Sequence, residues 1–420
     1  MKLLIIGAGP GGYETAIEAA KRGLEVTLVS EGPLGGTCLN EGCIPTKAFC
    51  ASATLADGLA RKQDIVPKLQ GGIAGLLRKV RIVEGHAGFV DARSVKVGEE
   101  VFSADRIIIA TGSVSASLPI PGADLCITSK EMLELTEVPK RLCVIGGGVI
   151  GLEFASVYRR FGSEVSVLEY CPGILPRFDE DLAKRLKSSL VKQGISIETS
   201  AQVLSVEKTA DGLRVKYVKK DAECYAEADT VLMAVGRKAN TVSLGLEAAG
   251  VEAGRRGITV DGNMRTNVPG IYAIGDVTGG IMLAHYASFQ GRRALNDICG
   301  EKDGIRFDIC PAAVFTTPEV ATVGLTEEDC KARGIAFTPH KAFYRANGKA
   351  LAMDESEGYC KVLTDDGDRI LGCHIMGAHA SDLVHEAAVL MNLGATLTQA
   401  RDIIHAHPTL SEVLQAAFNA

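Results

Sequence analysis

Residues 3–12 read LLIIGAGPGG, in which an apolar run ends at Ile6 and a glycine-rich turn begins at Gly7. A helical pattern follows the glycines, and a second strand pattern runs from Glu25 to Val29. Glycines at the first two positions of a GxGxxG pattern make the tight turn and let backbone N–H groups approach a pyrophosphate at the helix N-terminus. The stretch therefore predicts a β-α-β unit that holds a dinucleotide, although one such pattern by itself also fits an ordinary turn.

The arrangement recurs later in the chain. Residues 142–151 read LCVIGGGVIG, again an apolar run followed by glycines, and Glu164–Leu168 supplies the second strand. The two glycine stretches begin at Gly7 and Gly146, which lie 146 − 7 = 139 residues apart. Two units in matching context predict an α/β chain with two Rossmann-like domains and at least one bound nucleotide.

Length and composition exclude several classes of protein. The chain has 420 residues, which is long for one hydrophobic core and predicts more than one domain. Its formal net charge is −6 and its Lys and Arg are scattered, so the sequence shows no basic surface for nucleic acid. No apolar run approaches the roughly 18 residues that span a bilayer. The first strand pattern begins almost at Met1, so we expect no signal peptide. The 12 cysteines include no Cys-x-x-Cys pair, which predicts a cytoplasmic protein with mostly reduced thiols and no metal site.

Other segments predict how the rest of the chain is organised. Ile107–Gly112 (IIIATG) and Thr230–Gly236 (TVLMAVG) are apolar strands that end in small residues, where backbone would lie near a cofactor, unless both are simply buried strands. Beyond Gly300 come a strand pattern at Gly372–Met376 and a helical pattern at Ala380–Leu393, without a glycine fingerprint. We therefore expect a third domain that binds no nucleotide.

The segment that carries the chemistry is GGTCLNEGCIPTK, residues 35–47. In an ideal helix the Cα atoms of Cys38 and Cys43 would lie about 8.7 Å apart, whereas a disulfide needs less than about 7 Å. The pair therefore closes only where the helix start is distorted, which Gly42 and Pro45 permit. A thiol at a helix N-terminus near Lys47 also has a lowered pKa, which favours the reactive thiolate. Two unrelated core cysteines are the alternative on spacing alone.

GGTCLNEGCIPTK resembles the redox-disulfide signature of dihydrolipoamide dehydrogenases, in the class I pyridine nucleotide–disulfide oxidoreductase family, and the likeness extends over nearly the whole chain. Three more segments carry it: TNVPGIYAIGDV (residues 266–277), MLAH (282–285) and HAHPTLSE (405–412). The resemblance implies two Rossmann-like domains, one for FAD (residues 1–115 and 238–305) and one for NAD (116–237). It also implies an α+β C-terminal interface domain (306–420) that forms a homodimer.

The resemblance also implies roles for the site residues. Cys38 would exchange with the substrate, and Cys43 would lie next to the flavin. His407 would take the proton of the substrate thiol, oriented by Glu412, while His405 would be structural. Thiol–disulfide exchange needs a thiolate, and His is the side chain whose proton moves near neutral pH. Without the motif, His407 would as readily be a packed or capping histidine.

Further residues are predicted to bind FAD and NAD. Lys47 and Glu153 would pair beside the flavin and nicotinamide rings, unless they are solvated charges on helices. Glu169 ends the second strand of the second unit, where its carboxylate would accept from a ribose 2′-OH and repel a 2′-phosphate, which favours NAD over NADP. The predicted cofactor-binding residues are Gly7, Gly9, Gly12, Glu31, Lys47, Thr111, Gly112, Gly146, Gly148, Gly151, Glu153, Glu169, Gly236, Asp276, Met282, Leu283, Ala284 and His285.

The sequence departs from the family pattern in three places. Ser30 stands where the family has an acidic residue, so either Glu31, one position later, bends in or the contact to the FAD ribose is weaker. Gln290 stands where the family usually has Glu. The stretch between Cys50 and Gly72 is much shorter than the expected helical region, which normally lines part of the FAD and substrate approach.

The function that follows is oxidation of dihydrolipoamide, free or on a lipoyl-domain protein, by NAD through Cys38, Cys43 and FAD. One alternative is another NAD(P)H-dependent disulfide reductase of the glutathione type, although the arginines favoured for NADP are not seen. A redox-active C-terminal tail is also not seen, since the last cysteine is Cys373. The other alternative is a flavoprotein without enzymatic activity, acting as a structural subunit or redox sensor.

Overall fold

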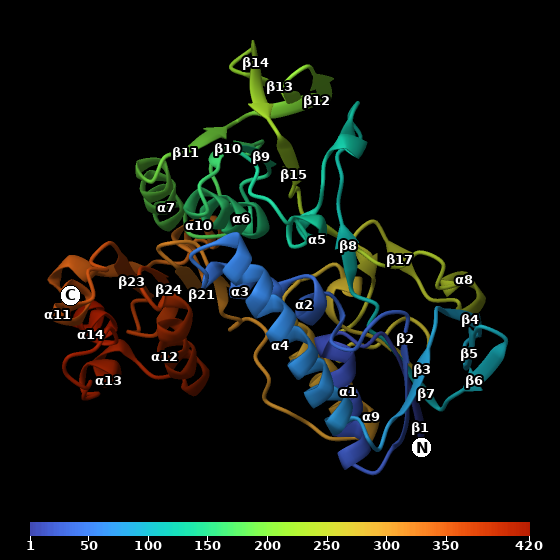
Figure 1. The fold of residues 1–420 in the computed structure, drawn as a ribbon. Coiled ribbons are helices and arrows are strands. Elements are labelled where there is room, and N and C mark those ends of the chain that lie inside the picture. Colours follow the sequence, from blue (N-terminus) through green and yellow to red (C-terminus); the bar gives the residue numbers. More distant parts are fainter. The chain divides into compact units, whose positions relative to one another are not determined.

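The computed structural model describes residues 1–420, which divide between two units of the chain (Figure 1). The first unit contains Met1–Ala116, Ser129–Glu134 and Gly236–Ile305, and the second contains Ser117–Thr128, Leu135–Val235 and Arg306–Ala420. The first unit nearly coincides with the predicted FAD domain. The second contains both the predicted NAD domain and the predicted interface domain, whose separation stays a prediction.

A five-stranded parallel sheet in the order β19-β7-β1-β2-β3 forms the centre of the first unit. Leu3 to Ile6 in its central strand are at most 3% exposed, which explains why that strand is continuously apolar rather than alternating. The elements are β1 (Lys2–Ile6), α1 (Pro10–Lys21), β2 (Glu25–Ser30), α2 (Gly36–Asn40), α3 (Cys43–Cys50), α4 (Leu55–Leu76), β3 (Arg81–Glu84), β4 (Ala87–Asp91), β5 (Ser94–Val97), β6 (Glu100–Ser103), β7 (Arg106–Ile109), β8 (Ser113–Ser115), α5 (Ser129–Met132), β16 (Arg237–Ala239), α8 (Leu246–Ala249), β17 (Ala253–Gly254), β18 (Gly257–Ile258), β19 (Ile271–Ala273), η2 (Gly275–Thr278) and α9 (Ala284–Cys299).

The second unit contains a four-stranded parallel sheet, β11-β10-β9-β15, and a three-stranded antiparallel sheet, β12-β13-β14. Its C-terminal part is a five-stranded antiparallel sheet, β20-β21-β24-β23-β22, on which α12 and α14 pack. The elements are η1 (Ala123–Leu125), β9 (Arg141–Ile145), α6 (Val149–Arg160), β10 (Glu164–Glu169), α7 (Glu180–Lys192), β11 (Ile195–Thr199), β12 (Gln202–Thr209), β13 (Gly212–Lys219), β14 (Ala222–Ala228), β15 (Thr230–Met233), β20 (Ala312–Val314), β21 (Val320–Gly324), α10 (Glu327–Arg333), β22 (Thr338–Phe343), η3 (Tyr344–Ala346), α11 (Gly348–Ala352), β23 (Tyr359–Thr364), β24 (Ile370–Met376), α12 (Ala380–Leu393), α13 (Leu397–Arg401) and α14 (Glu412–Phe418).

The predicted strands and helix are confirmed, with one difference at the strand ends. β7 stops at Ile109 and β15 at Met233, so the small residues after them lie in loops beyond the sheets. Three residues after each strand end, Gly112 and Gly236 have φ angles of +70° and +109°, so neither segment continues as an extended strand through its glycine.

The short stretch after Cys50 forms most of one helix, α4. Its first turn is capped by Thr54, whose hydroxyl accepts from the Asp57 N–H at 3.2 Å. The helix has 22 residues and carries charges along its length. Neither this helix nor any other is long and apolar enough to cross a membrane.

Candidate active site

The glycine-rich loop after β1 leaves no room for side chains at two positions and open space at a third. A Cβ on Gly7 would lie 2.3 Å from the Ala110 carbonyl oxygen, and one on Gly12 would lie 1.8 Å from the Gly7 carbonyl oxygen. A Cβ on Gly9 would meet nothing within 4 Å. Gly7 and Gly12 are therefore required by the fold, whereas Gly9 keeps a space clear for something outside the chain.

The loop after β9 repeats this geometry. A Cβ on Gly146 would lie 2.3 Å from the Ala234 carbonyl oxygen, one on Gly151 would lie 2.0 Å from the Gly146 carbonyl oxygen, and one on Gly148 would meet nothing within 4 Å. The internal repeat seen in the sequence is thus also a repeat of steric environment at each of the three glycine positions.

Each loop leads into a helix of 12 residues with no side-chain cap. Gly9 is the N-cap of α1 and Gly148 the N-cap of α6, and neither has a side chain that could accept from the first backbone N–H groups. The first backbone N–H groups of each helix therefore have no side-chain acceptor at the N-cap, and the helix dipole adds positive potential there. Both sites therefore fit the pyrophosphate of a dinucleotide.

Asp276 follows β19 at the same carboxyl edge of the first sheet, in η2. Its Oδ2 accepts from the Ser113 hydroxyl, which in turn accepts from Arg237 Nε at 2.7 Å. The backbone N–H of Gly275 donates to Gln290 Oε1 at 2.6 Å. Gln290 is 4% exposed and supplies a neutral acceptor at the position where the family usually has Glu.

Thr111 and Gly112 lie in the loop between β7 and β8. The Thr111 hydroxyl donates to the Asn240 carbonyl at 2.7 Å, and the Asn240 N–H donates to the Gly112 carbonyl at 2.9 Å. Met282 and Leu283 directly precede α9, whose first two residues are Ala284 and His285. The cofactor contacts predicted for these residues stay predictions.

Ser30 and Glu31 mark the departure from the family pattern at the end of β2. Ser30 is buried and its hydroxyl donates to the Gly32 carbonyl at 2.6 Å. Glu31 Oε2 lies 3.2 Å from His86 Nδ1, and His86 Nε2 lies 2.9 Å from the Ser243 carbonyl oxygen. The carboxylate of Glu31 thus has a partner within the protein, and its contact to the FAD ribose stays a prediction.

The cysteine pair lies across a break between two helices. Cys38 is in α2, the chain turns at Gly42 with φ −140° and ψ −112°, and Cys43 is the first residue of α3. A Cβ on Gly42 would lie 2.8 Å from the Thr37 carbonyl oxygen. The predicted distortion at the helix start is confirmed, and it brings the two thiols within hydrogen-bonding distance.

The protonation of this pair is uneven. The pKa of the Cys38 thiol is raised, first by its hydrogen bond to Cys43 and then by burial, while the charge of Lys47 opposes the shift. The lowered pKa predicted for a thiol of this segment therefore does not apply to Cys38. Cys43 is the first residue of α3, where the positive end of the helix dipole favours a thiolate over a thiol.

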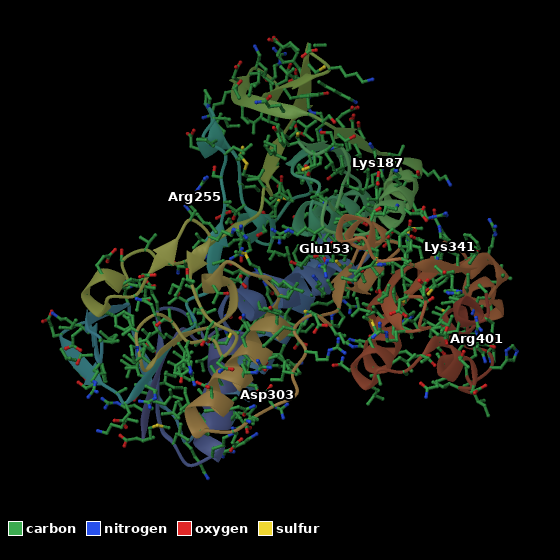
Figure 2. All side chains as sticks on the ribbon, turned by 180° about the vertical axis from the view of Figure 1, so that it is seen from behind. Glu153, Lys187, Arg255, Asp303, Lys341 and Arg401 are labelled. Atoms are coloured by element: carbon green, nitrogen blue, oxygen red, sulfur yellow. The ribbon has the colours of Figure 1, made fainter.

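Two acidic residues of the second nucleotide unit are buried. Glu169 is 7% exposed and accepts from the backbone N–H groups of Gly147 and Cys171, each at 2.6 Å. Glu153, on α6 and labelled in Figure 2, is 3% exposed and accepts from the Phe315 N–H at 2.9 Å. Glu153 is therefore not a solvated surface charge, while its pairing with Lys47 stays a prediction.

The histidine motif near the C-terminus contains two different environments. His405 Nε2 lies 2.8 Å from Glu386 Oε1, and its side chain is only 4% exposed, as a structural residue requires. His407 has a side chain 78% exposed, and its Nδ1 lies 2.9 Å from Glu412 Oε1. The pKa of Glu412 is lowered, first by the Thr409 N–H and then by His407. An ionised carboxylate only accepts, so Nδ1 carries the proton and Nε2 is the basic nitrogen.

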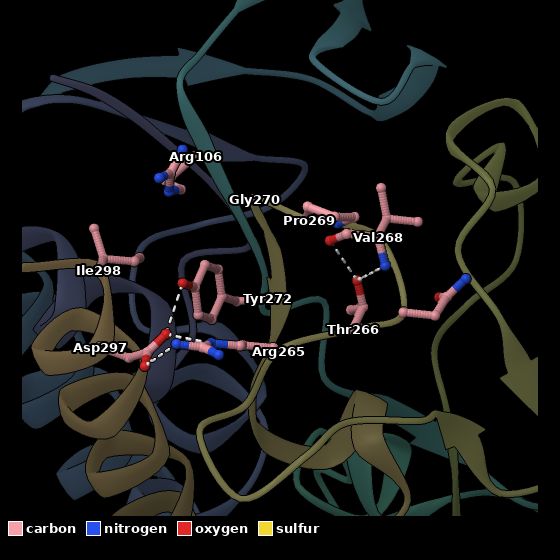
Figure 3. A pocket seen from close by; sticks show the side chains of 10 residues that line it. Arg106, Arg265, Thr266, Val268, Pro269, Gly270, Tyr272, Asp297 and Ile298 are labelled. Atoms are coloured by element: carbon pink, nitrogen blue, oxygen red, sulfur yellow. Dashed lines mark hydrogen bonds and ion pairs between the residues drawn. The ribbon is translucent and has the colours of Figure 1, made fainter. Parts of the chain in front are cut away.

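The first unit also contains a cavity of about 380 Å³, and none of the predicted site residues lines it (Figure 3). It is lined by the loop from Thr266 to Gly270 and by Arg265, which forms an ion pair with Asp297 at 2.6 Å. Arg106, the first residue of β7, marks the N-terminal edge of the parallel sheet. Because ligands bind parallel sheets at the carboxyl edge, this cavity is not the nucleotide site.

Several residues near the candidate site were missed from the sequence. Ser113 and Arg237 are 124 residues apart, and His86 and Ser243 are 157 apart, so no local pattern joins either pair. Of these residues, only Ser113 could have been found from the sequence, because it directly follows Thr111 and Gly112, which the sequence places near a cofactor.

Comparisons with known proteins agree with this geometry. The family model described as pyridine nucleotide-disulphide oxidoreductase matches residues 1–291, and the model of that family's dimerisation domain matches residues 310–418. Dihydrolipoyl dehydrogenase of Bacillus subtilis is 41% identical over 99% of this chain and 95% of its own length. That of Cupriavidus necator is 41% identical over 99% of this chain and 96% of its own length. The HOCl-induced flavoprotein disulfide reductase of Escherichia coli has a TM-score of 0.92 at 30% identity, covering 100% of this chain and 99% of its own.

Proposed function

The chain belongs to the pyridine nucleotide-disulphide oxidoreductase family, and from this premise we propose that it oxidises dihydrolipoamide with NAD through Cys38, Cys43 and FAD. The observation that carries the proposal is the pair of thiols held together across the break between α2 and α3. The relatives named dihydrolipoyl dehydrogenase, at 41% identity over nearly full length, support this substrate.

The exchange begins with Cys38 and Cys43 joined as a disulfide. A thiolate of dihydrolipoamide attacks the Cys38 sulfur, and Cys43 leaves as a thiolate. The second substrate thiolate then attacks the substrate sulfur of the mixed disulfide. This closes the disulfide of lipoamide and expels Cys38 as a thiolate, which takes up one of the two substrate protons. The substrate loses two electrons and two protons, and the cysteine pair gains the electrons. The N-terminus of α3 stabilises the charge on Cys43.

His407 and Glu412 would handle the substrate proton. Nε2 of His407 accepts it, and Glu412 holds the Nδ1–H and balances the imidazolium charge. Bound FAD would supply the two-electron redox chemistry that connects the cysteine pair with NAD. Glycines 7, 9 and 12 and Asp276 would hold FAD, and Gly146, Gly148, Gly151 and Glu169 would hold NAD, with Glu169 favouring an unphosphorylated ribose.

The partner and the place of action are part of the proposal. The substrate is a dihydrolipoyl group, free or attached to a lipoyl domain, and the enzyme is a cytoplasmic homodimer. The match of residues 310–418 to the family's dimerisation domain supports the dimer.

A panel of substrates tests the proposal. We expect NADH oxidation with lipoamide and little with glutathione disulfide or coenzyme A disulfide, and NADPH to be a poor donor for all three. Cys38→Ser should bind flavin normally and lose lipoamide turnover, while Cys50→Ser serves as a control because Cys50 lies outside the pair. Equal lipoamide turnover by Cys38→Ser and the wild type would contradict the role of the cysteine pair.

A second candidate is a disulfide reductase that uses NADH or NADPH to reduce another disulfide. The likeness to the Escherichia coli flavoprotein disulfide reductase, with a TM-score of 0.92, favours it as the alternative. Turnover of glutathione disulfide well above that of lipoamide would select this candidate. Absence of turnover with every disulfide would instead favour the non-enzymatic flavoprotein.

A further inference from the structure

Two short strands of the first unit, β8 and β16, join segments that are far apart in the sequence. They pair antiparallel, with Arg237 opposite Ser115 and Ala239 opposite Ser113. From this pairing Arg237 reaches back to Ser113, donating from Nε to the hydroxyl and from Nη2 to the carbonyl, both at 2.7 Å. The guanidinium is thus held to one residue by two hydrogen bonds.

The direction of these hydrogen bonds is determined by chemistry. A guanidinium has only donors, so the Ser113 oxygen must accept from Arg237. The single hydroxyl proton of Ser113 is then directed to Asp276 Oδ2. Ser113 is 8% exposed, so water does not readily replace either partner. Donation therefore runs in one direction, from Arg237 to Ser113 to Asp276.

The position of Asp276 allows its oriented carboxylate to contact a ligand. Its neighbour Gly275 and Gly11 of α1 both face Ala287, each with a Cβ position about 3 Å from that residue (3.0 Å and 3.2 Å). The η2 turn that contains Asp276 thus packs on α9, and α9 packs on α1, the helix that follows the glycine-rich loop. With Oδ2 bonded to Ser113, the carboxylate is fixed in rotation and presents Oδ1 as its second acceptor.

We propose that Arg237 is a positioning residue for FAD, acting through Ser113 to hold the Asp276 carboxylate ready for a hydroxyl of the ribityl chain. The inference rests on the proposed function in taking the ligand to be FAD. Arg237 is not needed merely to join the two segments, because Asn240 bonds the Thr111–Gly112 loop through its own backbone. Its specific effect is on the hydroxyl of Ser113 and thus on the carboxylate.

The test measures FAD release from the full-length holoenzyme by the gain of flavin fluorescence. Arg237→Met and Ser113→Ala should each release FAD about tenfold faster, the scale of one lost hydrogen bond to a charged group. The double variant should release FAD no faster than either single variant, since each substitution already removes the hydrogen bonding that orients the Asp276 carboxylate. In an Asp276→Asn background, Arg237→Met should have no further effect. Lys238→Met is the matched control, since Lys238 is the exposed neighbour in β16 and should behave as wild type.

A structural role would give other results. If Arg237→Met released FAD at the wild-type rate, or if its effect multiplied with that of Ser113→Ala, the proposal would be overturned. It would also be overturned if Arg237→Met lowered the melting temperature at saturating FAD without changing the release rate. A wild-type protein that binds no flavin would refute the proposed function together with this inference. If the wild type binds FAD and both Arg237→Met and Ser113→Ala release it at the wild-type rate, only the inference is refuted.

Discussion

At the scale of single residues, the protonation of His86 follows from its two hydrogen-bond partners. Its two ring nitrogens face the Glu31 carboxylate and the Ser243 carbonyl, and both of these groups only accept hydrogen bonds. The imidazole satisfies both partners only when each nitrogen carries a proton, which is the cationic form. The pKa of His86 is accordingly raised, first by the Ser243 carbonyl and then by Glu31.

This environment predicts a pH dependence at the end of β2. Because the pKa of His86 is raised in the folded state, the stabilisation it brings is fully present below the ordinary histidine pKa of about 6.5 and is lost as the pH rises through the raised value. In an NMR titration, His86 should have a midpoint above 6.5, and Glu31→Gln should lower that midpoint only in part, since Ser243 remains. His86→Gln identifies the resonance. A midpoint unchanged by Glu31→Gln would show that the pair does not form in solution.

At the scale of elements, the glycine-rich loops separate residues needed for folding from residues needed for binding. The two loops repeat the same pattern of two blocked glycines and one open glycine, although their sequences share only the glycines. Backbone blocks a side chain at the first and last glycine, while the middle glycine borders open space at a bare helix N-terminus. Stability and cofactor affinity should therefore be separable by single substitutions.

Gly9→Ala and Gly12→Ala are the matched pair for this prediction. Gly9→Ala should fold with a near-normal melting temperature and lose FAD affinity, because its methyl group occupies the space left for the pyrophosphate. Gly12→Ala should lose stability, since its Cβ would lie 1.8 Å from the Gly7 carbonyl oxygen. Circular dichroism melting and flavin content of the purified proteins check both. If Gly9→Ala also failed to fold, the assignment of the open space to FAD would lose its support.

A buried ion cluster makes a second prediction at this scale. Lys361 on β23 is 0% exposed, and its Nζ lies 2.6 Å from Asp179 Oδ1 and 2.7 Å from Glu327 Oε1. Lys361→Met should lower the free energy of unfolding by roughly 3–5 kcal/mol, because it removes the ion-pair partner of the fully buried Asp179 carboxylate. Lys341, directly opposite on β22 and labelled in Figure 2, pairs with the partly exposed Asp181.

Lys341→Met is therefore the control for Lys361→Met, with an expected loss of only about 0–1 kcal/mol. Urea unfolding followed by circular dichroism compares the two variants in the same sheet. Equal losses would mean that burial of the cluster contributes nothing beyond a surface ion pair.

At the scale of the whole molecule, the residues proposed as catalytic lie in segments near the two ends of the chain. Cys38 and Cys43 belong to the first unit and His407 and Glu412 to the second, within the segment that matches the family's dimerisation domain. His407 is exposed in the single chain, with its basic Nε2 directed away from Glu412. We expect each active site to combine the cysteines of one subunit with the histidine of the other, and the two-fold symmetry of a dimer would then give two identical composite sites.

Mixed dimers test this shared site. Cys38→Ser and His407→Gln homodimers should each be nearly inactive with lipoamide, the latter by roughly the 10²- to 10⁴-fold loss that follows removal of a general base. Heterodimers formed after subunit exchange should regain one intact site of the two. Oxidation of NADH by an artificial dye, which bypasses the disulfide, should survive in His407→Gln and serves as the control. Proven exchange without recovered activity would place all four residues in one chain.

The sequence by itself determined both β-α-β units, the strand positions, the break at Gly42 and the identity of the cysteine and histidine motifs. These features are local, because apolar runs, glycines and short spacings act within a few residues of one another. The tertiary structure alone decided that Glu31 faces His86, that Arg237 holds Ser113 and that Lys361 lies buried between two carboxylates. Each of these contacts joins residues from 34 to 182 positions apart. Such pairings depend on how strands align across a sheet and on which polar groups burial forces together, and neither is written in a local pattern.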